Sequence, residues 1–136
     1  MNNFPRNRYN SDELLMLFDN ADLQVIEGDF FKSIKVNGDD LEIYFPSTDG
    51  KVECKYIDMA RSALSQIREL DNLVQDSCES EYRKSNFHVR NYLLYLAIIE
   101  IKEDIVSFRY YGERVNTEWG AIFREDQKGI WKKVNF

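Results

Sequence analysis

Alternating apolar and polar positions predict a β-hairpin in the first third of the chain. Two runs rich in aromatic and β-branched residues, within residues 30–45, flank Asn37 and Gly38, a pair that accepts the positive φ angles of a tight turn. In the second run the residues at even spacing form one apolar face, which comprises Leu41, Ile43 and Phe45. Residues 51–57, KVECKYI, are rich in the same residue types, and we expect them to extend the hairpin as a third strand.

Helical periodicity is clearest in residues 58–78. The apolar residues of this segment recur at the spacing of one helix face, and they are Ala63, Ile67, Leu70, Val74 and Cys78. Asp58 is placed to cap this helix at its N-terminus. A shorter helix is predicted over residues 11–18, where Ser11 is the expected N-cap and acidic residues occupy the first turn.

Four apolar-rich runs predict strands in the C-terminal part of the chain. Residues 92–101 are apolar on both faces, which favours a central strand covered on each side, with a helix as the alternative. Three alternating runs follow, and the short turns between them, at 102–104, 112–116 and 126–129, indicate an antiparallel meander. The polar residues 79–91 fit a helix extension, a second short helix or a loop.

Together these elements predict one α+β domain spanning residues 1–136, with an N-terminal strand pair, a central amphipathic helix and a C-terminal antiparallel β-meander. A chain of this length buries about two thirds of its unfolded surface, so it needs neither disulfide nor metal to fold. No apolar run approaches the roughly 20 residues of a membrane span, and the N-terminus lacks the apolar stretch of a signal peptide. We therefore expect a cytoplasmic protein.

The negative charge of the chain is concentrated in its first 58 residues. The formal net charge is −6; residues 1–58 contain 12 Asp or Glu against 6 Lys or Arg, whereas residues 59–136 contain 12 of each. An acidic surface is repelled by nucleic acid and by anionic membranes, and it is attracted to basic partners. The excess charge either forms a functional acidic face or only keeps the domain soluble.

The sequence offers little for catalysis or cofactor binding. Its single histidine, His88, and its two cysteines, Cys54 and Cys78, cannot supply a four-ligand zinc site, and glycine-rich phosphate-binding motifs are absent from the sequence. Adjacent carboxylates occur at 39–42, 103–104 and 125–126, all beside predicted turns, where acids are common. A Cys–His pair or a carboxylate pair would be needed for an enzyme, and we expect no catalytic residue, metal or cofactor.

The last part of the chain carries a motif, YYG at residues 110–112 followed by NTEW at residues 116–119. This pattern resembles the terminal meander of small bacterial α+β proteins. Several of those proteins occur beside polymorphic toxins and are regarded as immunity proteins, including those of contact-dependent growth inhibition systems. The resemblance implies a protein that binds and neutralises a cognate toxin and that does no chemistry of its own.

The resemblance assigns no binding residues, because such interfaces vary between cognate pairs. Many such toxins are nucleases with basic clefts, and an acidic surface fits a basic cleft. The candidate toxin-binding residues are therefore five acids of the N-terminal half together with three tyrosines, a residue type enriched at interface hot spots: Asp39, Asp40, Glu42, Asp49, Glu53, Tyr44, Tyr56 and Tyr111.

Two other hypotheses stay open at this point. One is a general intracellular interaction or scaffold domain, which self-associates as a homo-oligomer through a free edge of the meander. The other is an enzyme that uses carboxylates such as Glu118 or the pair Asp39 and Asp40. The expected partner is a toxin protein or a second copy of the chain, and neither nucleic acid nor a membrane.

Overall fold

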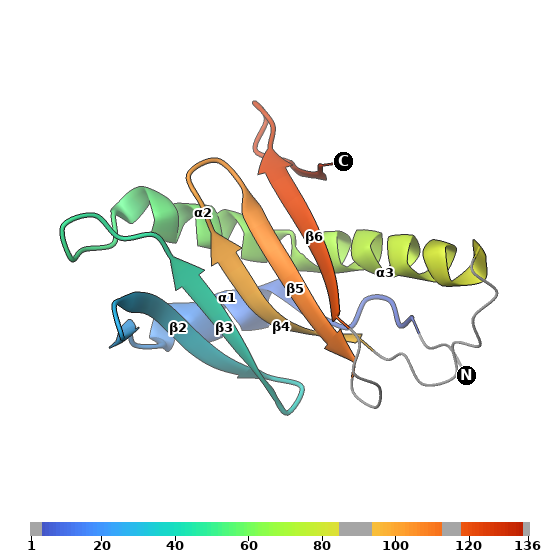
Figure 1. Cartoon of the computed structure of the whole chain (residues 1–136), viewed down its shortest axis with the longest axis horizontal. Helices are drawn as coiled ribbons and strands as arrows, with labels where there is room; N and C mark the ends of the chain where they lie inside the picture. The colour runs from blue at the N-terminus through green and yellow to red at the C-terminus, as the bar shows by residue number, and fades with distance from the viewer. Residues whose placement is uncertain (1–3, 85–93, 113–117, 135–136) are drawn as a thin grey trace.

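Asn37 and Gly38 form the turn of the predicted hairpin, with φ angles of 53° and 86°. The computed structural model describes residues 4–84, 94–112 and 118–134. Within these ranges the protein is α+β, with three helices and a seven-stranded sheet (Figure 1). The helices are α1 (Ser11–Asn20), α2 (Cys54–Ser65) and α3 (Ile67–Lys84). The strands are β1 (Gln24–Ile26), β2 (Asp29–Val36), β3 (Asp39–Phe45), β4 (Leu94–Ile101), β5 (Val106–Gly112), β6 (Glu118–Glu125) and β7 (Trp131–Lys133).

The order of the strands in the sheet follows their order in the chain, from β1 to β7. Neighbouring strands are antiparallel except for β3 and β4, which are parallel. Parallel neighbours need a long crossover connection, and here α2 and α3 provide it. The strands are therefore spread along the chain, and the predicted strand pair and the predicted meander are two parts of one sheet.

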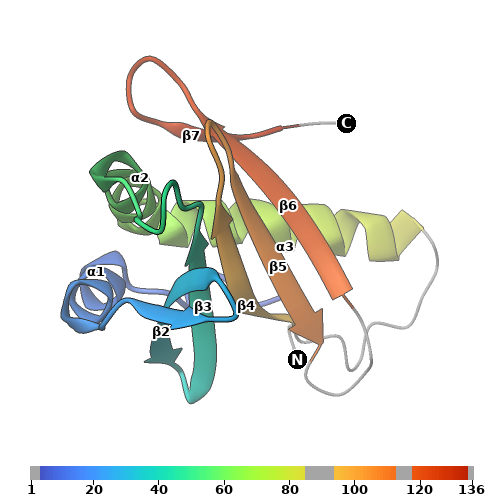
Figure 2. The same cartoon turned by 60° about the vertical axis from the view of Figure 1, so that its left-hand side comes forward.

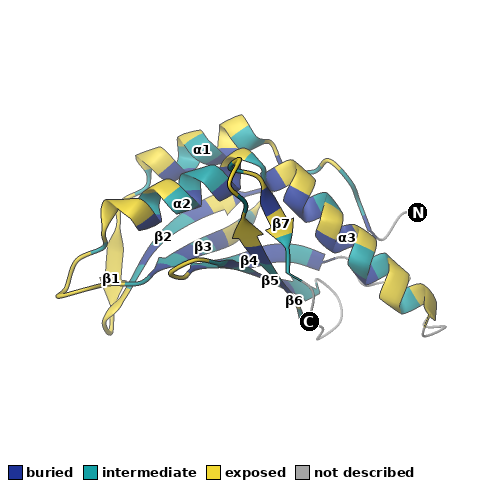
Figure 3. Cartoon of the chain, turned by 90° about the horizontal axis from the view of Figure 1, so that it is seen from above, coloured by how far each residue is buried: buried dark blue, intermediate teal, exposed yellow. Residues whose placement is uncertain are grey.

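All three helices lie on the same side of the sheet (Figures 2 and 3). The core fills the space between the helices and the sheet. The predicted apolar face of β3 points into this core, since Leu41, Ile43 and Phe45 are all buried. Phe123 of β6 is completely buried, and its ring lies tilted against the Phe108 ring of β5, with the centroids 4.9 Å apart. The rings of the aromatic-rich C-terminal segment thus belong in large part to the core.

Two predictions about the helices are wrong in detail. Residues 51–57 do not form a third strand, because α2 begins at Cys54 and buries the Tyr56 ring on the core side of the helix. The predicted helix over 58–78 is two helices that meet at Gln66, so Asp58 lies inside α2 and caps nothing. The predicted apolar stripe is nevertheless entirely buried, and α3 extends through the first part of the ambiguous segment to Lys84.

Side-chain hydrogen bonds explain both the helix break and the start of α1. The Gln66 side chain accepts a hydrogen bond from Trp131 N at 2.9 Å and donates one to Gly129 O at 2.7 Å, which fastens the β6–β7 turn to the helices. Asn10, and not Ser11, caps α1, since its Oδ1 accepts a hydrogen bond from Glu13 N at 3.0 Å.

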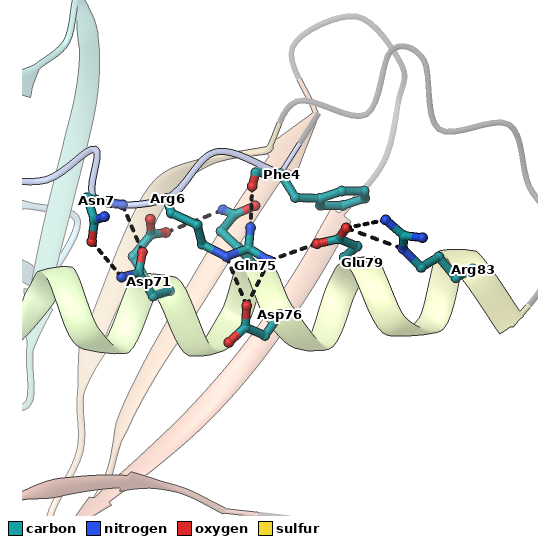
Figure 4. Close-up of polar contacts among 9 residues, drawn as sticks. Phe4, Arg6, Asn7, Asp71, Gln75, Asp76, Glu79 and Arg83 are labelled. Carbon is teal, nitrogen blue, oxygen red and sulfur yellow. Dashed lines mark hydrogen bonds and ion pairs between the residues drawn. The ribbon is translucent and has the colours of Figure 1, made fainter. Parts of the chain in front are cut away.

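The N-terminal segment, residues 4–10, is fastened along α3 (Figure 4). The Arg6 guanidinium bonds to Asp76 at 2.9 Å and to Glu79 at 2.8 Å. Farther along the segment, the Tyr9 hydroxyl accepts a hydrogen bond from Leu96 N at 3.1 Å, beside the irregular pairing of β4 with β5. The segment therefore packs on both α3 and the sheet.

Candidate functional site

The side of the sheet that faces away from the helices is the main candidate for a binding surface. Within the described residues no helix packs on it, so the prediction that β4 is covered on each side is wrong for this part of the chain (Figure 3). Strand register places the outward-pointing residues of β3, β4, β5 and β6 side by side. We call this surface the open face, and its central members are Glu42, Tyr44, Ile98, Glu100, Arg109 and Glu118.

Two hollows adjoin on the open face, and Arg109 lines both. The first has a volume of about 430 Å³ and is lined in part by Asp29, Tyr44, Ile98 and Glu100. The second has a volume of about 470 Å³ and is lined in part by Ser107, Glu118, Gly120 and Ile122. Gly120 has no side chain, so it leaves the second hollow deeper than a larger residue at this position would. The open face is therefore concave at these two places, and its aromatic, aliphatic and charged groups lie close enough together to contact a single partner.

Arg109 is held between two carboxylates. Its Nη2 lies 3.2 Å from Glu100 Oε1 and its Nε lies 3.4 Å from Glu118 Oε1. A hydrogen bond with the Tyr111 side chain raises the pKa of Arg109 above its ordinary value, and the charge of Glu100 raises it further. The guanidinium is therefore always positive. Because Glu100 and Glu118 share this one cation, the three side chains together have a net charge of −1.

Tyr44 stands in the acidic part of the open face. Its hydroxyl donates a hydrogen bond to Glu42 Oε2 at 3.3 Å, and its ring lies 5.2 Å from the Phe31 ring, centroid to centroid. Partial burial raises the pKa of Tyr44, and the nearby charges of Glu42, Asp29 and Glu100 raise it further. Three carboxylates thus act on one phenol, so the potential around it is negative.

The structure brings together only part of the predicted binding set. Glu42, Tyr44 and Tyr111 lie on the open face, and so does Asp40, which pairs with Lys35 across the hairpin at 3.9 Å. Asp39 pairs in register with Val36 and points to the helix side of the sheet.

The other three predicted residues lie outside the open face. Asp49 and Glu53 are exposed in the loop between β3 and α2. Tyr56 is only 7% exposed and belongs to the core, so the expectation that it contacts a partner is corrected. Its apolar neighbours at helical spacing would have indicated this burial, had the segment been assigned to a helix.

Sequence reasoning missed Asp29, Glu100, Arg109 and Glu118 as members of one surface. Glu100 and Arg109 meet across neighbouring strands, and Glu42 joins them only through the parallel β3–β4 pairing. Alternation along each strand tells which residues share a face with one another, but the register between distant strands is absent from any short pattern. The one available signal was the alternation of Arg109 with buried Phe108 and Tyr110.

The remaining candidate groups show no catalytic arrangement among the described residues. Cys78 is buried, and burial raises the pKa of its thiol to about 12, whereas Cys54 is exposed at the start of α2. Asp39 and Asp40 point to opposite faces of the sheet and do not converge. His88, and hence the possible Cys–His pair, lies outside the described residues. Across the described ranges there is no cluster of three metal-ligating side chains.

The carboxylates at the β6–β7 turn have a structural role. Asp126 Oδ1 accepts hydrogen bonds from Lys128 N at 2.8 Å and from Ile130 N at 3.0 Å. The hydrogen bond from Ile130 is the main cause that lowers the pKa of Asp126. This acid therefore shapes a turn, as its position in the sequence suggested.

Comparisons with protein-family models, with curated proteins and with solved structures gave no match. Among the described helices none is both long and apolar enough to cross a membrane.

Proposed function

We propose that this protein is a cytoplasmic immunity protein of a bacterial toxin system, and that it neutralises its cognate toxin by binding it through the open face. The observation that most supports this proposal is the acidic hollow at Tyr44. This hollow lies on the open face beside Arg109. The resemblance of the C-terminal motif supplies the class of partner, and the surface chemistry supplies the site.

The motif and the site overlap only at Tyr111 and Glu118, which lie on the open face. Tyr110 is completely buried, and Trp119 packs against the core, so these members of the motif hold the meander in place. Tyr111, between them, points to the open face, and residues 116 and 117 lie outside the described ranges. The buried residues of such a motif are shared because they stabilise the fold. The surface residues that select a partner can differ from one protein of this class to another.

The charge of the hollow favours a basic partner. Asp29, Glu42 and Glu100 surround Tyr44, and Arg109 offsets only part of their charge. A lysine or arginine of the partner can pair with the carboxylates and lie over the phenol ring, a cation–π contact. Nuclease toxins present such cations in their phosphate-binding clefts, and complementary charge accelerates capture and rejects wrong partners. A nuclease is therefore the toxin class that fits best.

Co-expression with the proposed cognate toxin, to be sought in the gene next to this one, tests the proposal. The wild-type chain should rescue growth, and the double variant Glu42→Gln with Glu100→Gln should rescue poorly, because it removes one charge that lines the hollow and one that is hydrogen-bonded to Tyr44 beside it. Glu81→Gln, on the exposed side of α3, is the matched control and should rescue fully. Failure of the wild-type chain to rescue cells would end the immunity proposal, and equal rescue by the double variant would end the role of the open face.

A general interaction domain without catalysis is the second candidate. It is favoured by the same pair of adjoining hollows, which suit a protein partner of any class. Binding of purified partner proteins that are unrelated to toxins, with loss of binding in the Glu42→Gln and Glu100→Gln double variant, would support this candidate against the first.

A further inference from the structure

The first edge of the sheet is unusually apolar for an exposed strand. Six large apolar residues among those described are exposed, and three of them fall within four consecutive positions: Leu23 at 42%, Val25 at 54% and Ile26 at 57%. β1 pairs with β2 along one of its edges, and its other edge is an outer edge of the sheet. Edge strands are commonly protected by charge, proline or a covering segment, because a bare edge invites another strand.

The geometry of the β1–β2 hairpin shows which backbone groups face outward. Glu27 and Gly28 form its two-residue turn, with φ angles of 51° and 83°, and Ile26 pairs with Asp29 beside the turn. In such a hairpin the pair next to the turn is hydrogen-bonded, and the following pair, Val25 with Phe30, is not. The N–H and C=O of Val25 therefore point away from β2, toward the open edge.

The charge along this edge selects the kind of strand that would add to it. Residues 22–29 contain three acids, Asp22, Glu27 and Asp29, and no Lys or Arg, and every one of these eight residues is exposed. A second copy of the chain would bring three further acids against the first three, which disfavours edge-to-edge pairing of two copies. An incoming strand with lysine or arginine beside β-branched residues meets complementary charge and apolar surface.

We propose that the outer edge of β1 binds an extended, positively charged segment of a partner protein as an additional antiparallel or parallel strand. Main-chain hydrogen bonds at Val25 hold the segment, the exposed Leu23 and Ile26 side chains pack against its apolar residues, and the acids pair with its cations. This edge adjoins the open face and shares Asp29 with it, but the backbone groups that hold the segment lie at Val25, so the proposal stands independently of the immunity proposal.

The probe is a synthetic library of capped octapeptides in which Lys or Arg alternates with Val, Ile, Thr or Tyr, added to the full-length ¹⁵N-labelled protein. We expect members that bind with a Kd below about 1 mM, shift the amide signals of residues 22–27 and slow the hydrogen exchange of Val25 N–H. A library with Asp or Glu in place of the cations should not bind.

Val25→Pro is the decisive variant, because it removes the outward N–H without removing a hydrogen bond to β2. It should weaken binding about tenfold, which is the effect of one lost main-chain hydrogen bond. Val25→Thr, which keeps the N–H and the branched side chain, should bind like the wild type. If the proline variant unfolds, the double variant Asp22→Asn with Glu27→Gln decides, since it leaves the backbone intact and should weaken binding and flatten its salt dependence.

Three results of the peptide experiments would overturn the proposal. They are the absence of any binding member in the basic library, equal binding by wild type and by whichever variant remains folded, and amide shifts that map to Tyr44 and Arg109 instead of residues 22–27. Dimerisation of the free protein through this edge, seen as concentration-dependent sedimentation that Val25→Pro abolishes, would also overturn it, because the occupant would then be a second copy.

Discussion

The Tyr110 hydroxyl donates a hydrogen bond of 2.8 Å to Asp71 Oδ1, and both side chains are buried, with exposed fractions of 0% and 1%. This contact ties β5 to the N-terminal part of α3. Arg8 also reaches Asp71, with Nε 3.1 Å from Oδ2, so the N-terminal segment, the helix and the sheet meet at one carboxylate. The arrangement positions β5, and with it Arg109 on the opposite side of the strand.

Tyr110→Phe should destabilise the protein, because it removes the hydroxyl that donates a hydrogen bond to the buried Asp71. The phenylalanine ring still fills the space of the tyrosine ring, so the variant isolates the loss of the hydrogen bond. We expect the free energy of unfolding to fall by about 1–3 kcal/mol. Urea denaturation followed by circular dichroism measures this change. A variant as stable as the wild type would show that the hydroxyl contributes nothing beyond packing.

The two arginines of the N-terminal segment should differ in their contribution to stability. Arg8→Ala leaves a nearly fully buried Asp71 without its cation, and should lower the free energy of unfolding by about 2–3 kcal/mol. Arg6→Ala removes ion pairs to Asp76 and Glu79 that water can reach, and should cost under about 1 kcal/mol. Urea denaturation of both variants tests the contrast, and equal losses would contradict it.

The two cysteines should react at very different rates. Cys54 is exposed and should react with an aromatic disulfide reagent in the folded protein, whereas Cys78 should react only after unfolding. Counting reactive thiols before and after addition of denaturant checks this. Two rapidly reacting thiols in the folded state would contradict the burial of Cys78.

Burial of Cys78 also gives stability a pH dependence in alkaline solution. The pKa of this thiol rises from its ordinary 9.0 to about 12, so the folded state keeps a proton that the unfolded state loses. The contribution is fully present below pH 9 and is lost as the pH rises from about 9 to 12, at about 1.4 kcal/mol per pH unit. Denaturation of the wild type and of Cys78→Ala across this range separates the effect, because the variant should lack this share of the slope.

Local patterns were enough to predict the hairpin, the apolar stripe of the helices and the central position of β4. Asn37 and Gly38 mark a turn chemically, and the spacing of Ala63, Ile67 and Leu70 marks a buried helix face. Residues 51–57 were misassigned because β-rich composition is a weaker influence than the packing that Tyr56 gains in a helix. Where tertiary packing competes with propensity, the packing decides.

The candidate site was less predictable than the fold. Glu42 and Tyr44 could be selected by charge and residue type, but Glu100 and Arg109 come from strands more than fifty residues later in the sequence. Their place beside Tyr44 depends on the parallel pairing of β3 with β4, which sets Tyr44 opposite Glu100. No local pattern encodes that pairing, because it is fixed by how the two crossover helices pack on the sheet.

The most direct test of the proposed binding surface is the calorimetric Kd of the purified protein for its proposed cognate toxin, compared between the wild type and Tyr44→Ala. If the open face is the binding surface, truncation of Tyr44 should weaken binding about thirtyfold, or about 2 kcal/mol, as for an interface hot spot. Leu73→Ala, an exposed position on α3, is the control and should leave the Kd unchanged. A folded Tyr44→Ala variant that binds the toxin as tightly as the wild type would contradict the account.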